Sequence, residues 1–223
     1  MDAPKRIAIH WVTLGPFATN CYIVRVEGSK GCWIVDAGYE PDELIDRVRA
    51  EGLTPRAIVL THAHPDHIAG VRDVLAAFPG TPIWVHRAER EWLVDPELNL
   101  STLIGIPVTA PKADRVFDGG EELELEGTRW RVLHTPGHSP GGITLFNADA
   151  LTAIVGDTLF AGSVGRTDFP GSNPAALVRS IRGELYKLPP RTRVLPGHGP
   201  ETTIGEEMAG NPFVPAAGTT GDW

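Results

Sequence analysis

The chain has 223 residues, of which 22% are charged, and a formal net charge of −8 at pH 7. This length suits one large domain or two small ones and allows a sizeable hydrophobic core. The acidic balance argues against a general nucleic-acid binder, because binding to a phosphate backbone needs clustered Lys and Arg. No stretch is apolar for long enough to predict a signal peptide or a membrane-spanning helix. We therefore expect a cytoplasmic protein that acts on a small molecule, as a monomer or homodimer, without nucleic-acid or membrane partners.

The two cysteines fit a reducing compartment. Cys21 and Cys32 lie in apolar, strand-like runs, and neither belongs to a Cys-x-x-Cys motif. Buried free thiols are therefore expected, rather than a disulfide or a zinc finger.

The first half of the chain alternates strand-like and helix-like segments. Apolar or alternating runs predict strands at residues 6–12, 21–26, 31–36, 57–60 and 82–85. Apolar residues at helical spacing predict helices at residues 41–50, 67–78 and 88–94. Residues 99–114 contain Pro and Gly and predict an irregular loop.

The second half repeats the alternation. Strands are predicted at residues 122–125, 129–133, 142–146, 151–155 and 193–195. A helix is predicted at residues 173–186, with Asn173 as its N-cap and Pro174 in its first position, and a short helix from residue 206. This order suits two sheets packed face to face with helices outside, a four-layer α/β/β/α sandwich, among other mixed α/β folds. We expect residues 1–214 to form a single catalytic domain and residues 215–223 to be a mobile tail.

One short run carries the strongest chemical signal. Directly after the strand at 57–60 the chain reads Thr61-His62-Ala63-His64-Pro65-Asp66-His67. Histidine is the commonest metal ligand, and carboxylate oxygen suits harder or borderline metals. Residues two apart point the same way in extended chain, so His62 and His64 can reach one ion together. Asp66 and His67 follow where the chain turns and can face the other side, which suggests more than one metal position.

Three later residues repeat this context. His138, Asp157 and His198 each follow an apolar strand-like run and lie next to a glycine. Taken singly, each would be an ordinary loop or turn residue. If these strand ends share one edge of the fold, seven candidate ligands converge on one site.

This set of residues resembles the metal-site pattern of the metallo-β-lactamase superfamily, and the resemblance covers nearly the whole chain. It implies the four-layer fold and a site for two divalent ions. One ion would be held by His62, His64 and His138, the second by Asp66, His67 and His198, and Asp157 would bridge them. Asp66 and Asp157 are the expected catalytic residues. Zinc is the expected metal, with iron and manganese as alternatives, because all three suit mixed nitrogen and oxygen ligands.

Two segments narrow the resemblance. Residues 156–168, which include Arg166, resemble the glyoxalase II branch, and the region from Pro196 onwards is similar to short bacterial hydroxyacylglutathione hydrolases. The resemblance implies hydrolysis of a thioester such as S-lactoylglutathione, by attack of a metal-bridging hydroxide on the carbonyl. The common β-lactamases have cysteine or serine near this position, whereas this chain has Asp157. Ordinary glyoxalase II carries a C-terminal helical domain that contacts glutathione, and this sequence stops before one, so the thiol carrier stays open.

Arg166 is the expected substrate-binding residue, because a guanidinium can grip a carboxylate with two hydrogen bonds. The alternative is a surface ion pair with Asp168. A persulfide dioxygenase with a single iron is the first alternative for the whole chain, but its last histidine lies in a different context from Gly197-His198-Gly199-Pro200. A lactonase, a phosphodiesterase and a non-enzymatic metal-binding module are the others. Asp36, which also ends a strand, is expected to support the ligands rather than bind metal.

Overall fold

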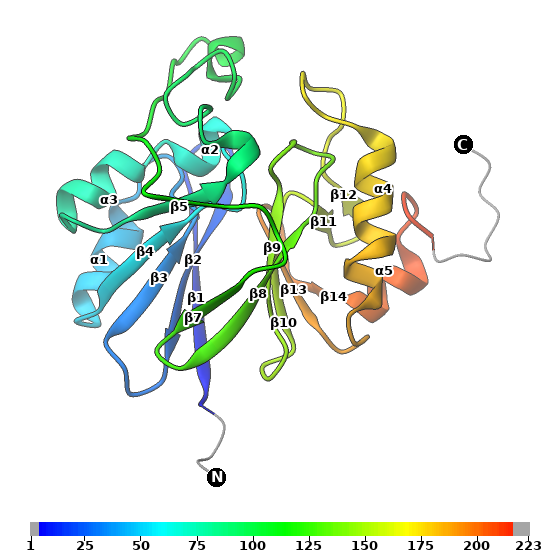
Figure 1. The fold of residues 1–223 in the computed structure, drawn as a ribbon, viewed down its shortest axis with the longest axis horizontal. Coiled ribbons are helices and arrows are strands. Elements are labelled where there is room, and N and C mark those ends of the chain that lie inside the picture. Colours follow the sequence, from blue (N-terminus) through cyan, green and yellow to red (C-terminus); the bar gives the residue numbers. More distant parts are fainter. Residues whose placement is uncertain (1–4, 216–223) are drawn as a thin grey trace.

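A computed structural model describes residues 5–215 of the chain. Two six-stranded sheets pack face to face, and helices cover the outer face of each (Figure 1). The predicted four-layer α/β/β/α sandwich is confirmed.

The first sheet contains the N-terminal strands in chain order: β1 (Ile7–Leu14), β2 (Thr19–Val26), β3 (Gly31–Val35), β4 (Thr54–Val59), β5 (Ile83–His86) and β6 (Arg115–Phe117). The first three strands pair antiparallel, and β3 to β6 pair parallel. Helices α1 (Asp42–Ala50) and α3 (Val71–Ala77) cover its outer face. The buried face of α1 consists of Leu44 and Ile45 with Val48, which follows them by four and three residues.

The second sheet has the order β14-β13-β10-β9-β8-β7. Its strands are β7 (Glu122–Leu125), β8 (Thr128–His134), β9 (Ile143–Asn147), β10 (Thr152–Gly156), β13 (Arg193–Pro196) and β14 (Thr202–Thr203). Helices α4 (Pro174–Gly183) and α5 (Ile204–Gly210) lie outside it, and a hairpin, β11 (Leu159–Phe160) with β12 (Ser163–Val164), follows β10. The side chain of Asn173 caps α4 as predicted, accepting a hydrogen bond from the amide of Ala176 at 2.9 Å.

The alternation of side chains along the strands builds a separate core on each side of a sheet. In β2, Tyr22 and Val24 point between the sheets, whereas Cys21 and Ile23 point toward the helices. The core between the sheets centres on Trp33 of β3 and Trp130 of β8, whose rings lie 6.0 Å apart. Both cysteines are buried and free, as expected.

Several predicted elements differ in detail. The helix predicted at 67–78 is two helices, α2 (Pro65–Ile68) and α3. At the break, the amide of Gly70 donates to the carbonyl of Ala37 at 2.9 Å, and a Cβ at Gly70 would collide with the carbonyl of Gly38. The helix predicted at 88–94 is only a 3-10 turn, η1 (Arg87–Glu89), followed by irregular turns. The loop at 99–114 contains another 3-10 turn, η2 (Ser101–Ile104), and a third, η3 (Leu185–Lys187), follows α4. The short strands β6, β11, β12 and β14 were not predicted.

Within residues 5–215, no helix combines the length and the apolar character that crossing a membrane requires. Residues 216–223, which include most of the predicted mobile tail, lie outside the described part of the chain. The single catalytic domain at 1–214 stays a prediction.

Candidate metal centre

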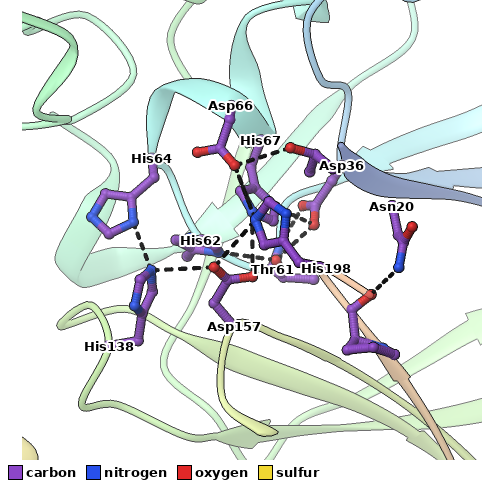
Figure 2. A network of polar contacts seen from close by, with 12 residues as sticks. Asn20, Asp36, Thr61, His62, His64, Asp66, His67, His138, Asp157 and His198 are labelled. Atoms are coloured by element: carbon purple, nitrogen blue, oxygen red, sulfur yellow. Dashed lines mark hydrogen bonds and ion pairs between the residues drawn. The ribbon is translucent and has the colours of Figure 1, made fainter. Parts of the chain in front are cut away.

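The ends of four strands meet at one edge of the sandwich and carry the polar residues picked out from the sequence (Figure 2). The loop after β4 carries His62 and His64, and the loop after β8 carries His138. Asp157 directly follows β10, and His198 lies two residues beyond β13. Because β10 and β13 pair in parallel, their carboxyl ends reach the same edge.

All seven predicted ligand side chains come together here. Donor atoms form three groups, and within each group they lie within 4.8 Å of one another. The groups are His62, His64 and His138; His62, His67 and Asp157; and Asp66, His67 and His198.

The one-turn helix α2 directs two of these side chains toward the site. Pro65 occupies its first position, where a missing N–H costs no hydrogen bond. Asp66 and His67 follow in the same turn, and the hydroxyl of Thr19 donates to Oδ2 of Asp66 at 3.0 Å. The candidate metal ligands are therefore placed by the ends of regular strands and by the helix α2.

Asp157 lies between the donor groups. Its Oδ1 is 3.5 Å from Nε2 of His67, and its Oδ2 is 3.4 Å from Nε2 of His198 and 3.6 Å from Nε2 of His138. On the other side of the cluster, Nδ1 of His64 is 2.8 Å from Nε2 of His138. Two ring nitrogens at that distance need a proton or a cation between them, since two lone pairs would repel.

The donor set fits divalent cations. The Nε2 atoms of His62 and His67 and Oδ1 of Asp157 are buried and make no hydrogen bond. Leaving a buried polar atom unpaired costs about 1–3 kcal/mol, so native structures rarely gather several at one place. A cation bound by these atoms would remove that cost, and mixed imidazole and carboxylate ligands suit zinc, iron or manganese.

In three of the histidines the outer ring nitrogen is held by an oxygen acceptor, which turns the inner nitrogen toward the cluster. Nδ1 of His138 donates to the carbonyl of Arg166 at 2.8 Å, and Nδ1 of His198 donates to the carbonyl of Phe17 at 3.1 Å. Nδ1 of His67 donates to Oδ2 of Asp36 at 2.8 Å. Such contacts fix both the tautomer and the orientation of a metal-binding imidazole.

Asp36 supports the cluster from behind and is not one of the grouped donors. Its carboxylate also accepts hydrogen bonds from the backbone amide and the hydroxyl of Thr61, both at 2.7 Å. Asp36 has a φ of +61°, in the left-handed region that is unusual for a residue other than glycine. Strained backbone of this kind persists where surrounding contacts over-determine it.

The two ends of the cluster differ electrostatically. Burial and the neighbouring imidazole of His138 lower the pKa of His64 to about 3, so the His64 side chain stays neutral. At the other end, burial opposes protonation of His198, but hydrogen bonds to Asp157 and Asp66 raise its pKa to about 10. Burial likewise opposes ionisation of Asp66, but His67 and His198 outweigh it and lower the pKa of Asp66 to about 2. The carboxylates therefore attract a positive charge, whether a proton or a metal ion.

A cavity of about 280 Å³ opens beside the donors. Its lining includes His64, Asp66, His138, Asp157 and His198, together with apolar side chains from several loops. Arg166 lines it too, but its guanidinium pairs with Asp168 through two hydrogen bonds, of 3.0 and 2.8 Å. Arg166 therefore pairs with Asp168 and also lines the cavity, as its two expected roles require.

The sequence matches a family model described as the metallo-beta-lactamase superfamily over residues 14–198. The chain belongs to this superfamily. Among its relatives, the probable metallo-hydrolase YqgX of Bacillus subtilis is 42% identical over 90% of this chain and 94% of its own length. The hydroxyacylglutathione hydrolase GloC of Haemophilus influenzae is 35% identical over 92% of this chain and 97% of its own.

Two solved structures of the superfamily are similar over nearly their whole length. The BLEG-1 B3 metallo-beta-lactamase superposes with a TM-score of 0.89 at 42% identity, covering 93% of this chain and 99% of its own. TTHA1623 in a di-iron-bound form superposes with a TM-score of 0.81 at 39% identity, covering 92% and 100%. These similarities and the donor cluster support a metal-dependent hydrolase of the superfamily.

Glu89 supports the site and was missed from the sequence. The carboxylate of Glu89 is buried and accepts hydrogen bonds from the amides of Ala63 and Gly141, both at 2.6 Å. Ala63 lies between His62 and His64, and Gly141 follows His138 by three residues. In sequence, Glu89 belongs to the charged run Arg87-Ala88-Glu89-Arg90-Glu91, which looks like an exposed surface.

Proposed function

We propose that the protein hydrolyses a thioester with two divalent ions, zinc being the first metal to test. In this proposal one ion lies among His62, His64 and His138, and the second among Asp66, His67 and His198. The observation that carries it is the place of Asp157, whose two oxygens lie 3.4–3.6 Å from donors of both groups. A single carboxylate between two groups of ligands suits a bridging role.

The side chains of this chain would do the following. A pair of divalent ions supplies a water of lowered pKa and a Lewis acid for a carbonyl oxygen. Asp66 and Asp157 stay ionised at neutral pH, because the neighbouring histidines outweigh burial and hold the pKa of each carboxyl below its usual range. Asp36 and the carbonyl of Arg166 keep His67 and His138 in the orientation that binding requires.

The absence of a separate proton donor agrees with a thiolate leaving group, which departs without protonation. Of the described residues that line the cavity, Arg166 is the one ionisable side chain outside the donor set. Its hydrogen bonds to Asp168 raise its pKa further, so it serves poorly as an acid. The glutathione thioester is the first substrate to test for two reasons. The chain is similar to GloC, and its residues 156–168 resemble the glyoxalase II branch.

The test is an activity assay on protein reconstituted with zinc, iron or manganese, using S-lactoylglutathione. The proposal expects thiol release that disappears when the metal is removed and returns when it is restored. Absence of thioester cleavage with every metal would contradict it. Oxygen uptake with glutathione persulfide, in an iron-loaded sample that cleaves no thioester, would instead favour a persulfide dioxygenase.

β-Lactam hydrolysis is a second candidate, because the BLEG-1 structure is a B3 metallo-beta-lactamase and superposes over 93% of this chain. The same metal-loaded samples should be assayed with a chromogenic cephalosporin. A kcat/KM on the cephalosporin above that on every thioester would make β-lactam hydrolysis the better assignment.

A further inference from the structure

Apart from the candidate ligands, the wall of the cavity beside the metal centre is largely apolar. The wall is formed by Phe17, Leu100, Leu103, Ile104, Phe160 and Phe169. Several of these side chains are exposed to solvent: Leu103 is 65% exposed, Phe17 44% and Ile104 39%. Exposed apolar side chains gathered around a polar centre are typical of a ligand site.

The same wall offers little to an anionic substrate. Within residues 5–215, Arg166 is the only Lys or Arg that lines the cavity. Its guanidinium is held by two hydrogen bonds to Asp168 and lies 4.3 Å from the ring centre of Phe169. A glutathione thioester carries two carboxylates, and no free cation of the cavity wall faces them.

The loop that carries Leu103 and Ile104 has a fixed shape. The buried amide of Asn99 donates to the carbonyls of Trp92 and Val108, at 2.9 and 3.0 Å, and its oxygen accepts from the amide of Ser101 at 3.0 Å. The hydroxyl of Ser101 in turn accepts from the amide of Val108 at 2.9 Å. The 3-10 turn η2 therefore holds its apolar side chains at the cavity in spite of their exposure.

We propose that the preferred substrates are thioesters with an uncharged hydrocarbon chain, which lies against Leu103 and Ile104 while the carbonyl faces the metal centre. This rests on the proposed thioester hydrolysis and names its substrate class. Burying one methylene group is worth about 0.8 kcal/mol, which corresponds to a roughly fourfold gain in kcat/KM for each methylene that the wall covers. The chain can belong to the acyl group or to the thiol, and the experiment separates the two.

The experiment compares two series of thioesters on the metal-loaded protein. One series varies the acyl chain from acetyl to octanoyl on N-acetylcysteamine, and the other varies the thiol from ethanethiol to octanethiol on an acetyl group. S-Lactoylglutathione is the reference. The inference expects kcat/KM to rise over the first several methylenes in one series and to exceed that of S-lactoylglutathione.

A matched pair of variants ties the effect to the wall. Leu103→Asn should reduce the gain per methylene to less than twofold. The control is Ile106→Asn, because Ile106 lies in the same loop and is 56% exposed but does not line the cavity. This control should keep both the turnover and the dependence on chain length.

A binding measurement distinguishes failure of this inference from failure of the proposed function. Calorimetric titration with the uncleavable thioether S-octyl-N-acetylcysteamine should show binding that Leu103→Asn weakens at least fivefold and Ile106→Asn does not. Cleavage of S-lactoylglutathione without any rise along either series would overturn the inference and leave the proposed function intact. If no thioester is cleaved, the proposed function fails, and the thioether titration alone decides whether the wall binds a hydrocarbon chain.

Discussion

The carboxylate of Glu89 holds the amide of Ala63 at 2.6 Å and joins the loop of His62 and His64 to the rest of the site. Its other oxygen holds the amide of Gly141, 2.6 Å away, in the loop that follows His138. Glu89 is fully buried, so its carboxylate depends on hydrogen bonds such as these to offset the cost of leaving water. Glu89 therefore ties together two loops that carry candidate metal ligands, and it is not itself one of the grouped ligand residues.

Replacing Glu89 by Gln should lower the free energy of unfolding by about 1.5–3 kcal/mol, because an amide group must face one of the two N–H donors. Metal affinity should fall as well, since both loops lose their common anchor. Chemical denaturation and chelator competition measure the two effects. The control is Glu91→Gln, because Glu91 is exposed and its side chain pairs with Arg90 on the surface. If Glu89→Gln and Glu91→Gln have the same stability and the same metal affinity, Glu89 does not position the two loops.

Asp36→Asn should weaken metal binding about 10–100-fold, the usual effect of losing a carboxylate behind a metal-binding histidine. Asparagine offers one acceptor where Asp36 serves Thr61 and Nδ1 of His67 together. Competition with a chromogenic chelator gives the affinity. Asp46→Asn is the matched control, since its side chain is 78% exposed. An affinity within twofold of wild type for Asp36→Asn would show that His67 needs no such support.

Metal binding near pH 7 should release protons. In the metal-free protein, burial is outweighed by hydrogen bonds to Asp157 and Asp66, and the pKa of His198 rises to about 10. The ion must displace that proton, so apparent affinity should increase as the pH approaches 10. Calorimetric titrations in buffers of different ionisation enthalpy give the number of protons released. His198→Ala should release fewer protons than wild type, and an unchanged number would contradict this role for His198.

The same histidine should make the stability of the metal-free protein fall with rising pH, whereas the metal affinity rises. The raised pKa of His198 stabilises the fold fully below the unfolded value, about 6.5, and this contribution is lost as the pH rises through about 10. Thermal unfolding of metal-free protein between pH 6 and 10 should therefore show a loss in wild type that is smaller in His198→Ala. Parallel curves for the two proteins would argue against the shifted pKa.

Freeing Arg166 from its partner should help anionic substrates. Arg166→Ala should change kcat/KM for S-lactoylglutathione less than about threefold, because the guanidinium is already paired with Asp168 and exposed pairs contribute little. Asp168→Asn leaves the guanidinium available and should raise the same kcat/KM. Kinetics of the two variants decide the matter. A large loss in Arg166→Ala would mean that Arg166 leaves Asp168 to grip the substrate, as the sequence alone suggested.

The sequence predicts those residues of the site whose role shows in the neighbouring residues of the chain. Each of His62, His138, Asp157 and His198 follows an apolar strand, and the parallel pairing of β10 with β13 brings the last two together. Glu89 is different, because its partner Gly141 lies 52 residues away and nothing near it in sequence signals burial. The break at Gly70 also depends on a distant contact, with the carbonyl of Gly38. Strands as short as β14, with two residues, carry too few side chains for a period to show.

The metal content of wild type and Asp157→Ala tests the central claim most directly. Elemental analysis of the two proteins, prepared with the same excess of zinc, should give close to two ions per chain for wild type. The variant should hold fewer, because the carboxylate between His67, His138 and His198 is gone. Full metal content in Asp157→Ala, with normal turnover of S-lactoylglutathione, would contradict a two-ion centre bridged by Asp157.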